Sequence, residues 1–364
     1  MKNTFGNAVT VTLFGESHGE TIGAVLDGIC PGIPVDPDFI ARQLTLRRPQ
    51  GENARKEPDD FSIVSGVYNG LTTGAPLAVL IKNTEQNSTD YEPLRGVARP
   101  SHADYTAYVK YHGFADPRGG GHLSGRLTAP LVAVGAIALS ALAQKNIRVG
   151  THLSRLAGIG DRPFGDLSAD LERLANDPFP VLDETKKQQM QEAIAEAKAN
   201  GDSVGGILAT AVTGLPAGLG EPWFDSVESL LSHALFSVPA VKGVSFGDGF
   251  AFADKTGSEA NDAFSVRDDR LVTLTNHNGG VNGGITNGMP LIVSTVIKPT
   301  PSIRKEQQTA NFLTNENVTV SVTGRHDACI LPRAAVVVNS LTALTLCDLL
   351  SQRCCTDRFT GEIK

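Results

Sequence analysis

Residues 15–33 read GESHGETIGAVLDGICPGI and residues 201–219 read GDSVGGILATAVTGLPAGL, and these two stretches decide the fold. At one constant offset they share glycine and serine positions, including Ser17 with Ser203 and Gly28 with Gly214. A second match follows in the same order, between GLTTGAPLAVLIKNT (70–84) and GITNGMPLIVSTVIKPT (284–300). Two ordered matches predict two related halves, roughly 1–150 and 201–364, with a helical insertion over 151–200.

Each half ends in a long apolar segment, 128–144 and 333–351, which predicts a buried helix. Residues 8–14, 76–82 and 291–298 are rich in β-branched side chains and predict strands. These helices alternate with groups of strands rather than with single strands, which favours an α+β layered fold over a doubly wound one. Within the insertion, Asp183 is a predicted N-cap and Gly201 follows the end of a predicted surface helix.

The composition describes a folded chain with an acidic balance. The 364 residues carry a formal net charge of −7, and 41% of them are hydrophobic, which excludes wholesale disorder. The acidic balance argues against nucleic acid as a partner, although 32 Lys and Arg remain available for a local basic pocket. The apolar run 129–143 is shorter than a bilayer requires, and residues 1–14 lack a secretory signal pattern. With an odd count of five cysteines and no CxxC, we expect reduced thiols, a cytoplasmic location and no membrane.

Two histidines and two glycine-rich loops are the candidate chemical groups. His18 and His102 stand outside HxxxH and HExxH spacing, so we expect proton transfer near neutral pH rather than a metal site. RGGGHLSGR (118–126) precedes a predicted helix, and its glycines let backbone N–H groups approach an anion. NHNGGVNGGITNG (276–288) leads to KPTPS (298–302), another candidate phosphate loop. Neither a dinucleotide fingerprint nor a Walker loop is present.

The G-x-S-x-G pattern around Ser17 leaves a nucleophile elbow as one alternative. An elbow requires a following helix, whereas residues 21–28 read as a strand, so a hairpin that exposes Ser17 and His18 is the preferred interpretation. Arginines gather beside the glycine-rich loops and indicate a pocket for a small molecule with several negative charges: Arg47, Arg48, Arg55, Arg95, Arg99, Arg118, Arg126 and Arg325.

The sequence resembles the chorismate synthase family over nearly its whole length. The resemblance rests on GESHGETIGAVLDGICPG (15–32), RPSHADYTAYVKYHG (99–113), GGGHLSGRLTAPLVAVGAIA (119–138) and RHDACILPRAAVVV (325–338). It implies a single-domain β-α-β sandwich with an internal pseudo-repeat, assembled as a homotetramer. It also implies a carbon–oxygen lyase that eliminates phosphate from 5-enolpyruvylshikimate-3-phosphate, a 1,4-anti elimination that gives chorismate at the last common step of the shikimate pathway. The family uses reduced FMN without net redox change, and without a dinucleotide fingerprint here we expect an external source of reduced flavin.

The resemblance assigns roles residue by residue. It implies that His18 donates a proton near the leaving phosphate, that His102 lies by the flavin ring, and that Asp327 takes a proton from flavin N5. Ser17 and Ser124 would support that relay. The implied substrate-binding residues are Arg47, Arg48, Arg99, Gly125, Arg126 and Arg325. The implied flavin-binding residues are His122, Leu123, Ser124, Pro239, Ala240, Gly283, Lys298, Pro299, Thr300, Pro301, Ser302 and Arg325.

Three departures from the family pattern stand out. Many members read Arg-Ser-Ser-Ala-Arg where this chain has HLSGR (122–126), and Glu where Asn339 stands. The loop after Arg48 is about three residues shorter, which leaves Arg55 as the candidate for a second loop arginine. A relative that binds flavin or substrate without catalysis is therefore the competing hypothesis.

Overall fold

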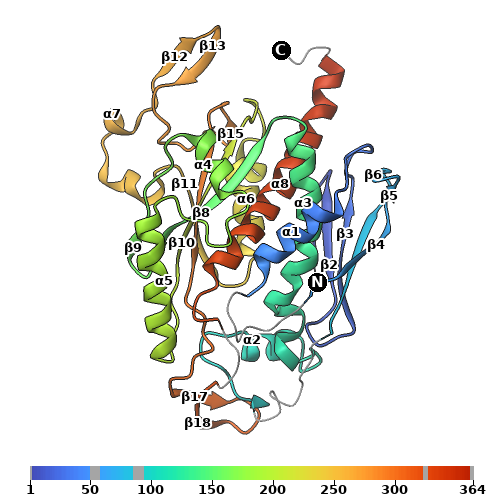
Figure 1. Cartoon of the computed structure of the whole chain (residues 1–364), viewed down its shortest axis with the longest axis vertical. Coiled ribbons are helices and arrows are strands. Elements are labelled where there is room, and N and C mark those ends of the chain that lie inside the picture. The colour runs from blue at the N-terminus through green and yellow to red at the C-terminus, as the bar shows by residue number, and fades with distance from the viewer. Residues whose placement is uncertain (1, 50–57, 85–93, 323–326, 361–364) are drawn as a thin grey trace.

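Two five-stranded antiparallel sheets face each other in the computed structural model, which describes residues 2–49, 58–84, 94–322 and 327–360 (Figure 1). The first sheet has the order β1 (Thr4–Phe5), β2 (Thr10–Phe14), β3 (Thr21–Asp27), β7 (Leu77–Lys82) and β4 (Phe61–Ser65). The second has the order β11 (Val241–Phe246), β16 (Leu291–Ile297), β10 (Gly206–Thr213), β8 (Arg148–Leu156) and β9 (Ile159–Gly160).

The two halves of the chain repeat one topology. The neighbours β2-β3-β7-β4 of the first sheet correspond to β8-β10-β16-β11 of the second. In each half a helix follows the second of these strands, α1 (Pro37–Arg47) or α6 (Val227–Phe236). A longer helix closes each half, α3 (Thr128–Ala143) or α8 (Leu331–Thr360). The matched glycine-rich stretches thus lead into the equivalent strands β3 and β10, and the predicted α+β layered sandwich is confirmed.

Helices α3 and α8 form the middle layer of the sandwich (Figure 1). Helix α3 contacts β3 and β7 on one side and α8 on the other, which is why it is apolar around its whole circumference. The helices approach so closely that a Cβ atom on Gly135 of α3 would lie 2.2 Å from the Cβ of Ser340 on α8. Glycine at 135 is therefore a packing requirement.

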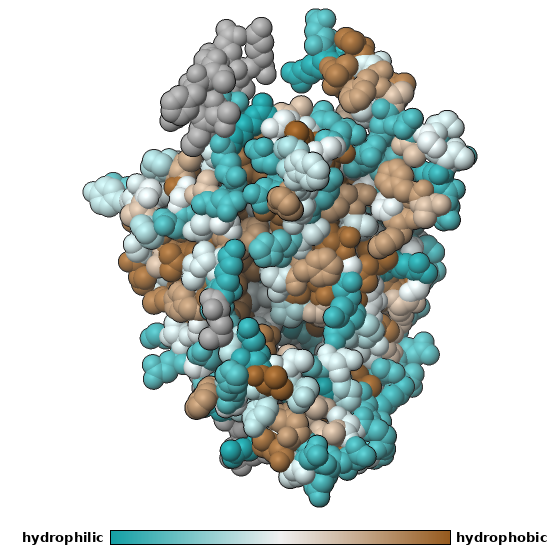
Figure 2. All heavy atoms as spheres, turned by 180° about the vertical axis from the view of Figure 1, so that it is seen from behind, coloured by the Kyte–Doolittle hydropathy of each residue, from teal (hydrophilic) through white to brown (hydrophobic). Residues whose placement is uncertain are grey.

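Two apolar stretches, Gly125–Ala143 and Leu331–Cys354, have the length and composition to cross a membrane. In this fold 72% and 83% of their apolar windows are buried, so they are its core helices. On the face seen in Figure 2, hydrophilic side chains are spread among apolar ones and no continuous apolar band is visible.

The segment 151–200 begins in β8 and then adds two helices, α4 (Leu167–Leu174) and α5 (Glu184–Ala199), which contact β8 and β9. As predicted, Asp183 caps α5, accepting hydrogen bonds from the N–H groups of Thr185 and Lys186. Small elements complete the chain: β5 (Val67–Tyr68), β6 (Leu71–Thr72), α2 (Asp104–Lys110), α7 (Gly257–Ala260), β12 (Phe264–Arg267), β13 (Arg270–Thr273), β14 (Val281–Asn282), β15 (Ile285–Thr286), β17 (Gln307–Asn311) and β18 (Glu316–Val320). Short 3₁₀ turns cover Arg118–Leu123, Gly125–Leu127, Trp223–Asp225 and Gly249–Asp254.

Candidate active site

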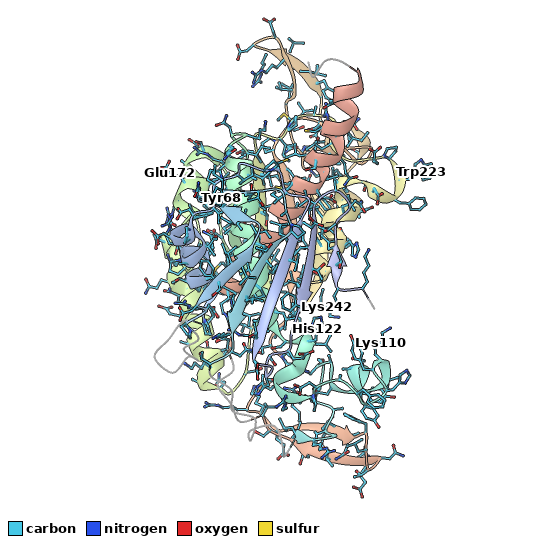
Figure 3. The ribbon with its side chains drawn as sticks, turned by 90° about the vertical axis from the view of Figure 1, so that its right-hand side faces the viewer. Tyr68, Lys110, His122, Glu172, Trp223 and Lys242 are labelled. Atoms are coloured by element: carbon cyan, nitrogen blue, oxygen red, sulfur yellow. The ribbon has the colours of Figure 1, made fainter. Side chains whose placement is uncertain are left out.

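A cavity of about 1,560 Å³ lies where α3 and α8 begin. Its wall is formed by the glycine-rich loop before α3, the first turns of both helices, the end of α6 and the segment after β16. His122 and Lys242 both line this wall, and Figure 3 labels them together with Lys110 at the end of α2. Because ligand pockets are typically roughly 300–1,000 Å³, this cavity has room for two small molecules. The N-terminal ends of two helices add partial positive charge to it.

The glycine-rich loop packs directly against Ser17 and His18. Gly119, Gly120 and Gly121 have φ values of 59°, 87° and 54°, a left-handed backbone that glycine adopts without strain. A Cβ on Gly119 would lie 2.4 Å from Cδ2 of His18 and 2.7 Å from Oγ of Ser17. Backbone thus approaches the histidine where a side chain would not fit, and His18 is only 4% exposed.

A buried carboxylate holds two arginines of the cavity wall. Asp59 accepts hydrogen bonds from Nη2 of Arg47, at 2.9 Å, and from Nη1 of Arg126. Burial acts to raise the pKa of Asp59, but the charges and hydrogen bonds of Arg47 and Arg126 outweigh it and leave that pKa below its ordinary value. Arg126 Nε also donates to Oδ1 of Asn83 at 2.9 Å. The guanidinium groups are therefore held in fixed positions beside the cavity.

Asp327 pairs with an arginine from the first turn of α8. Nη1 of Arg333 donates to the Asp327 carboxylate, and its Nε donates to the backbone carbonyl of Arg47 at 2.7 Å. One guanidinium thus connects α8 to the end of α1, so the two halves of the chain jointly position the Asp327 carboxylate at the cavity.

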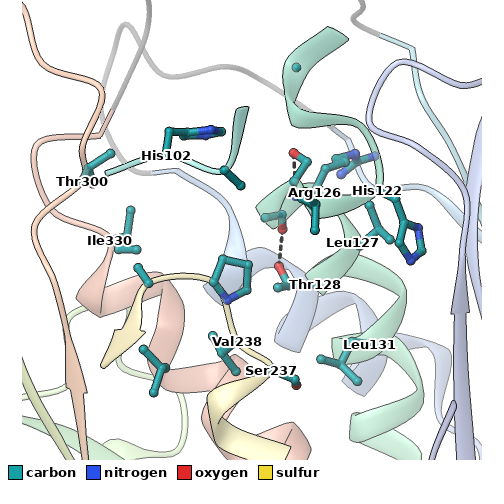
Figure 4. Close-up of a pocket in the computed structure, with 18 of the residues that line it drawn as sticks. His102, His122, Arg126, Leu127, Thr128, Leu131, Ser237, Val238, Thr300 and Ile330 are labelled. Carbon is teal, nitrogen blue, oxygen red and sulfur yellow. Dashed lines mark hydrogen bonds between the residues drawn. The ribbon is translucent and has the colours of Figure 1, made fainter. Parts of the chain in front are cut away.

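His102 lies on the cavity wall, in the close-up view of Figure 4 across the cavity from Leu131. Its Nδ1 atom is 3.1 Å from Nη2 of Arg99 and 3.2 Å from Oδ1 of Asp104. A Cβ on Gly120 would lie 3.9 Å from Cε1 of His102. The glycine-rich loop therefore separates the two histidines of the site.

The segment after β16 contributes a polar wall. Lys298 Nζ donates to the carbonyl of Ser101 at 2.5 Å, and burial, followed by the charge of Lys242, lowers the pKa of Lys298. The hydroxyl of Thr300 is buried and makes no hydrogen bond within the described part of the chain. A buried hydroxyl and an ammonium group on the wall of one cavity suit a phosphate or another anionic oxygen.

Residues 9–351 match the family model described as chorismate synthase. The chain is 44% identical to the chorismate synthase of Thermococcus gammatolerans over 96% of this chain and 97% of that protein. It is 47% identical to that of Chitinophaga pinensis, over 96% and 98%. The chain belongs to the chorismate synthase family. It is therefore an enzyme, a carbon–oxygen lyase acting on phosphates in aromatic biosynthesis.

A solved structure entitled Crystal Structure of Chorismate Synthase has the same fold. Its TM-score is 0.74 at 25% sequence identity, over 96% of this chain and 93% of that one. This likeness supports the layered arrangement independently of the internal repeat.

Most residues that the chorismate synthase resemblance predicts for the site line the single cavity described above. They are His18, Arg47, Arg99, His102, His122, Leu123, Ser124, Gly125, Arg126, Pro239, Ala240, Lys298, Thr300, Pro301, Ser302 and Asp327. They come from both halves of the chain, so the pseudo-repeat places one site between its halves.

Four predicted residues fall elsewhere, and a fifth lies outside the described residues. Ser17 lies behind the wall, where its hydroxyl can donate to the carbonyls of Arg118 and Gly119, each at 3.1 Å. Arg48 and Pro299 do not line the cavity, although Nε of Arg48 is 3.8 Å from Asp59. Gly283 is exposed at the β14–β15 hairpin, away from the cavity. Arg325, like Arg55, lies outside the described residues.

The departures from the chorismate synthase pattern have separate locations. His122 lines the cavity, and its Nδ1 donates to the carbonyl of Gly15 at 2.8 Å. Asn339 is half-buried between α8 and the second sheet, where its Oδ1 accepts from the Thr151 hydroxyl at 2.6 Å. The hydroxyl of Thr151 is also 2.7 Å from that of Thr210. The change at 339 therefore affects contacts between α8 and the second sheet, whereas those at 122 and 123 alter the cavity wall.

Asp59, Asp104 and Arg333 were missed by the sequence reasoning. Asp104 and Arg333 stood within quoted motifs, yet each acts through a partner that only the fold identifies. Asp59 lies in no recognisable motif. The nucleophile-elbow alternative for Ser17 is excluded by geometry, because strand β3 follows it and its hydroxyl faces carbonyl oxygens.

Proposed function

We propose that this chain catalyses the 1,4-anti elimination of phosphate from 5-enolpyruvylshikimate-3-phosphate to give chorismate. The observation that carries the proposal is the gathering of two histidines, one carboxylate and several cations around one cavity. The substrate has two carboxylates and a phosphate, which suit an arginine-lined wall. These charges also suit the positive ends of two helices.

The lining also fits reduced FMN, which has a flat ring system and a phosphate. The hydroxyl of Thr300, which has no hydrogen-bond partner among the described residues, and the ammonium of Lys298 suit the phosphate. The cavity volume that one substrate leaves unfilled suits the ring. The residues that would hold the flavin are His122, Leu123, Ser124, Pro239, Ala240, Lys298, Thr300, Pro301 and Ser302. When bound, reduced FMN supplies an electron transiently and recovers it, a task for which side chains are poorly suited.

The chain's own residues then serve charge and proton movement. Arg47 and Arg126, fixed by Asp59, stabilise the negative charge of the departing phosphate. His18 donates a proton near that phosphate, and Asp327, held by Arg333, accepts one through its carboxylate. The burial of His18 and both arginines keeps water from the leaving group.

The deciding assay mixes purified protein, 5-enolpyruvylshikimate-3-phosphate and chemically reduced FMN without oxygen. Chorismate and phosphate should appear in equal amounts, and release of neither would overturn the proposal. In a second arm, NADPH and oxidised FMN without added reductase should give no turnover, because we propose an external flavin reductant. Robust activity in that arm would contradict the external source.

A binding protein without catalysis is the second candidate, favoured by the altered wall at His122 and Leu123. Normal turnover would exclude it. Binding of FMN and substrate, seen as thermal stabilisation, without chorismate formation would establish it.

We also propose a cytoplasmic homotetramer. Two aromatic side chains, Trp223 and Phe224, are 85% and 89% exposed, and Trp223 projects from the body in Figure 3. Exposed aromatic side chains are typical of surfaces that another subunit covers. Light scattering should give four times the 38.4 kDa chain mass, and a monomer would contradict the assembly.

A further inference from the structure

The carboxylate of Asp104 binds Arg99 and His102 at once. Its Oδ2 accepts from the backbone N–H of Arg99 at 3.0 Å and from Nε at 2.8 Å, while Oδ1 accepts from Nη2 at 2.6 Å. Oδ1 is also 3.2 Å from Nδ1 of His102. Asp104 itself does not line the cavity, whereas Arg99 and His102 do.

This arrangement gives Nδ1 of His102 a partner in either protonation state. When Nδ1 carries a proton it can donate to Asp104 at 3.2 Å, and when it does not it can accept from Arg99 at 3.1 Å. The ring can therefore gain or lose a proton while keeping its position. A bidentate arginine–carboxylate pair is rigid, so the donor atom of Arg99 and the acceptor atom of Asp104 keep fixed positions relative to Nδ1 of His102.

We propose that Asp104 is a positioning residue that holds His102 at the cavity and stabilises its protonated form. The role in turnover rests on the proposed function, whereas the effect on the histidine does not. Two charged groups contact His102 in the part of the chain that the structure describes. The guanidinium of Arg99 disfavours the imidazolium, and Asp104 is the counter-charge.

The effect on the carboxylate has the same origin. Burial acts to raise the pKa of Asp104, but hydrogen bonds from Arg99 and His102, followed by their charges, hold it well below its usual value. Asp104 thus stays ionised across the working pH range. Removing its charge leaves His102 beside the guanidinium of Arg99 without that carboxylate, so the protonated ring loses its stabilising partner and should release its proton at lower pH.

Asp104→Asn is the test variant, and Asp116→Asn is the matched control. Asp116 accepts from the backbone N–H, Nε and Nη2 of Arg118 in the same way, and the charge of His18 acts on it, but its contacts in the described part of the chain do not include His102. Asp104→Glu restores the charge and serves as the conservative variant.

The first readout is the rate at which diethyl pyrocarbonate modifies the peptide containing His102, followed by mass spectrometry over pH 5–9. Only the unprotonated ring reacts, and His102 is partly accessible, with 28% of its side chain exposed. Asp104→Asn should move the midpoint to lower pH by at least about one unit. Asp116→Asn should leave the midpoint of His102 modification unchanged, and Asp104→Glu should return it most of the way to the wild-type value.

The second readout is the pH profile of chorismate formation. In Asp104→Asn the alkaline fall in kcat should begin about one unit lower, with activity recovering toward pH 6. An unchanged midpoint in Asp104→Asn would overturn the proposal, as would an equal shift of the His102 modification midpoint in Asp116→Asn. A wild type that makes no chorismate would refute the proposed function alone, since the modification profile would still decide the role of Asp104.

Discussion

Replacing Asp59 by asparagine tests the arginine pair on which the site is built. The Asp59 side chain is 0% exposed, and those of Arg47 and Arg126 are 2% and 5% exposed. Asparagine keeps the shape but removes a carboxylate charge that both guanidinium groups contact in the described part of the chain. It also places amide N–H donors opposite guanidinium groups, which have no acceptor atoms. The change therefore removes a counter-charge from two buried cations without creating a cavity.

The magnitude follows from this burial. Removing one partner of a buried ion pair costs about 3–5 kcal/mol, because the remaining charge stays buried. One amide oxygen can still accept a hydrogen bond, which places the expected loss near the lower end, about 3 kcal/mol. At about 1.4 kcal/mol per tenfold change, this is a roughly 100-fold fall in the folding equilibrium constant.

The loss depends on pH in a defined direction. The pKa of Asp59 in the folded chain is below its ordinary value of 3.8. The stabilisation from its ionised form is therefore fully present above pH 3.8 and is lost as pH falls through the lower folded pKa. The difference in the free energy of unfolding between wild type and Asp59→Asn should be constant near neutrality and should become smaller below about pH 4.

Urea unfolding followed by circular dichroism measures the effect. Asp202→Asn is the control, because Asp202 pairs with Lys305 on the surface and its loss should change stability little. Added phosphate should stabilise Asp59→Asn more than wild type, since an anion can replace the missing carboxylate. Equal stability of Asp59→Asn and wild type, or an equal response to phosphate, would refute the reasoning.

Further predictions concern single contacts of the core and the site. Gly135→Ala should destabilise the chain by about 1–3 kcal/mol in urea unfolding, because its Cβ would lie 2.2 Å from Cβ and 2.6 Å from Oγ of Ser340. Ser340→Gly should recover part of this loss and Ser340→Ala less of it, since Cα of residue 340 stays 2.8 Å from the new Cβ; equal recovery by both variants would contradict this contact. Gly119→Ala should abolish turnover, whereas Gly158→Ala, with similar backbone strain but open space around it, should retain it in the anaerobic assay; equal activities would argue against the loop packing. Asp327→Asn should bind FMN normally in a fluorescence titration but lose at least about 100-fold in rate, and a retained rate would exclude Asp327 as proton acceptor.

The architecture could be predicted from local patterns in the sequence. Two ordered repeats required two equivalent halves, and segments apolar on every side required helices covered on every side, which only a middle layer provides. The cap residue Asp183 and the following Gly201 located α5 because capping is a local interaction. The family motifs determined the group of residues around the cavity for a similar reason, since each motif is contiguous in sequence.

Only the tertiary structure decided which charges meet. Asp59 accepts a hydrogen bond from Arg126, which lies 67 residues away in the sequence. Arg333 donates to the backbone carbonyl of Arg47, which lies 286 residues away. Periodicity and capping report what a segment does within a few residues, whereas an ion pair depends on where distant segments are placed by packing. For the same reason, the sequence did not show that Gly283 is exposed outside the cavity. It also did not show that Asp104 is the partner of His102. The strength of these ion pairs depends on the burial of their side chains, and that burial arises only when the two sheets pack against the central helices.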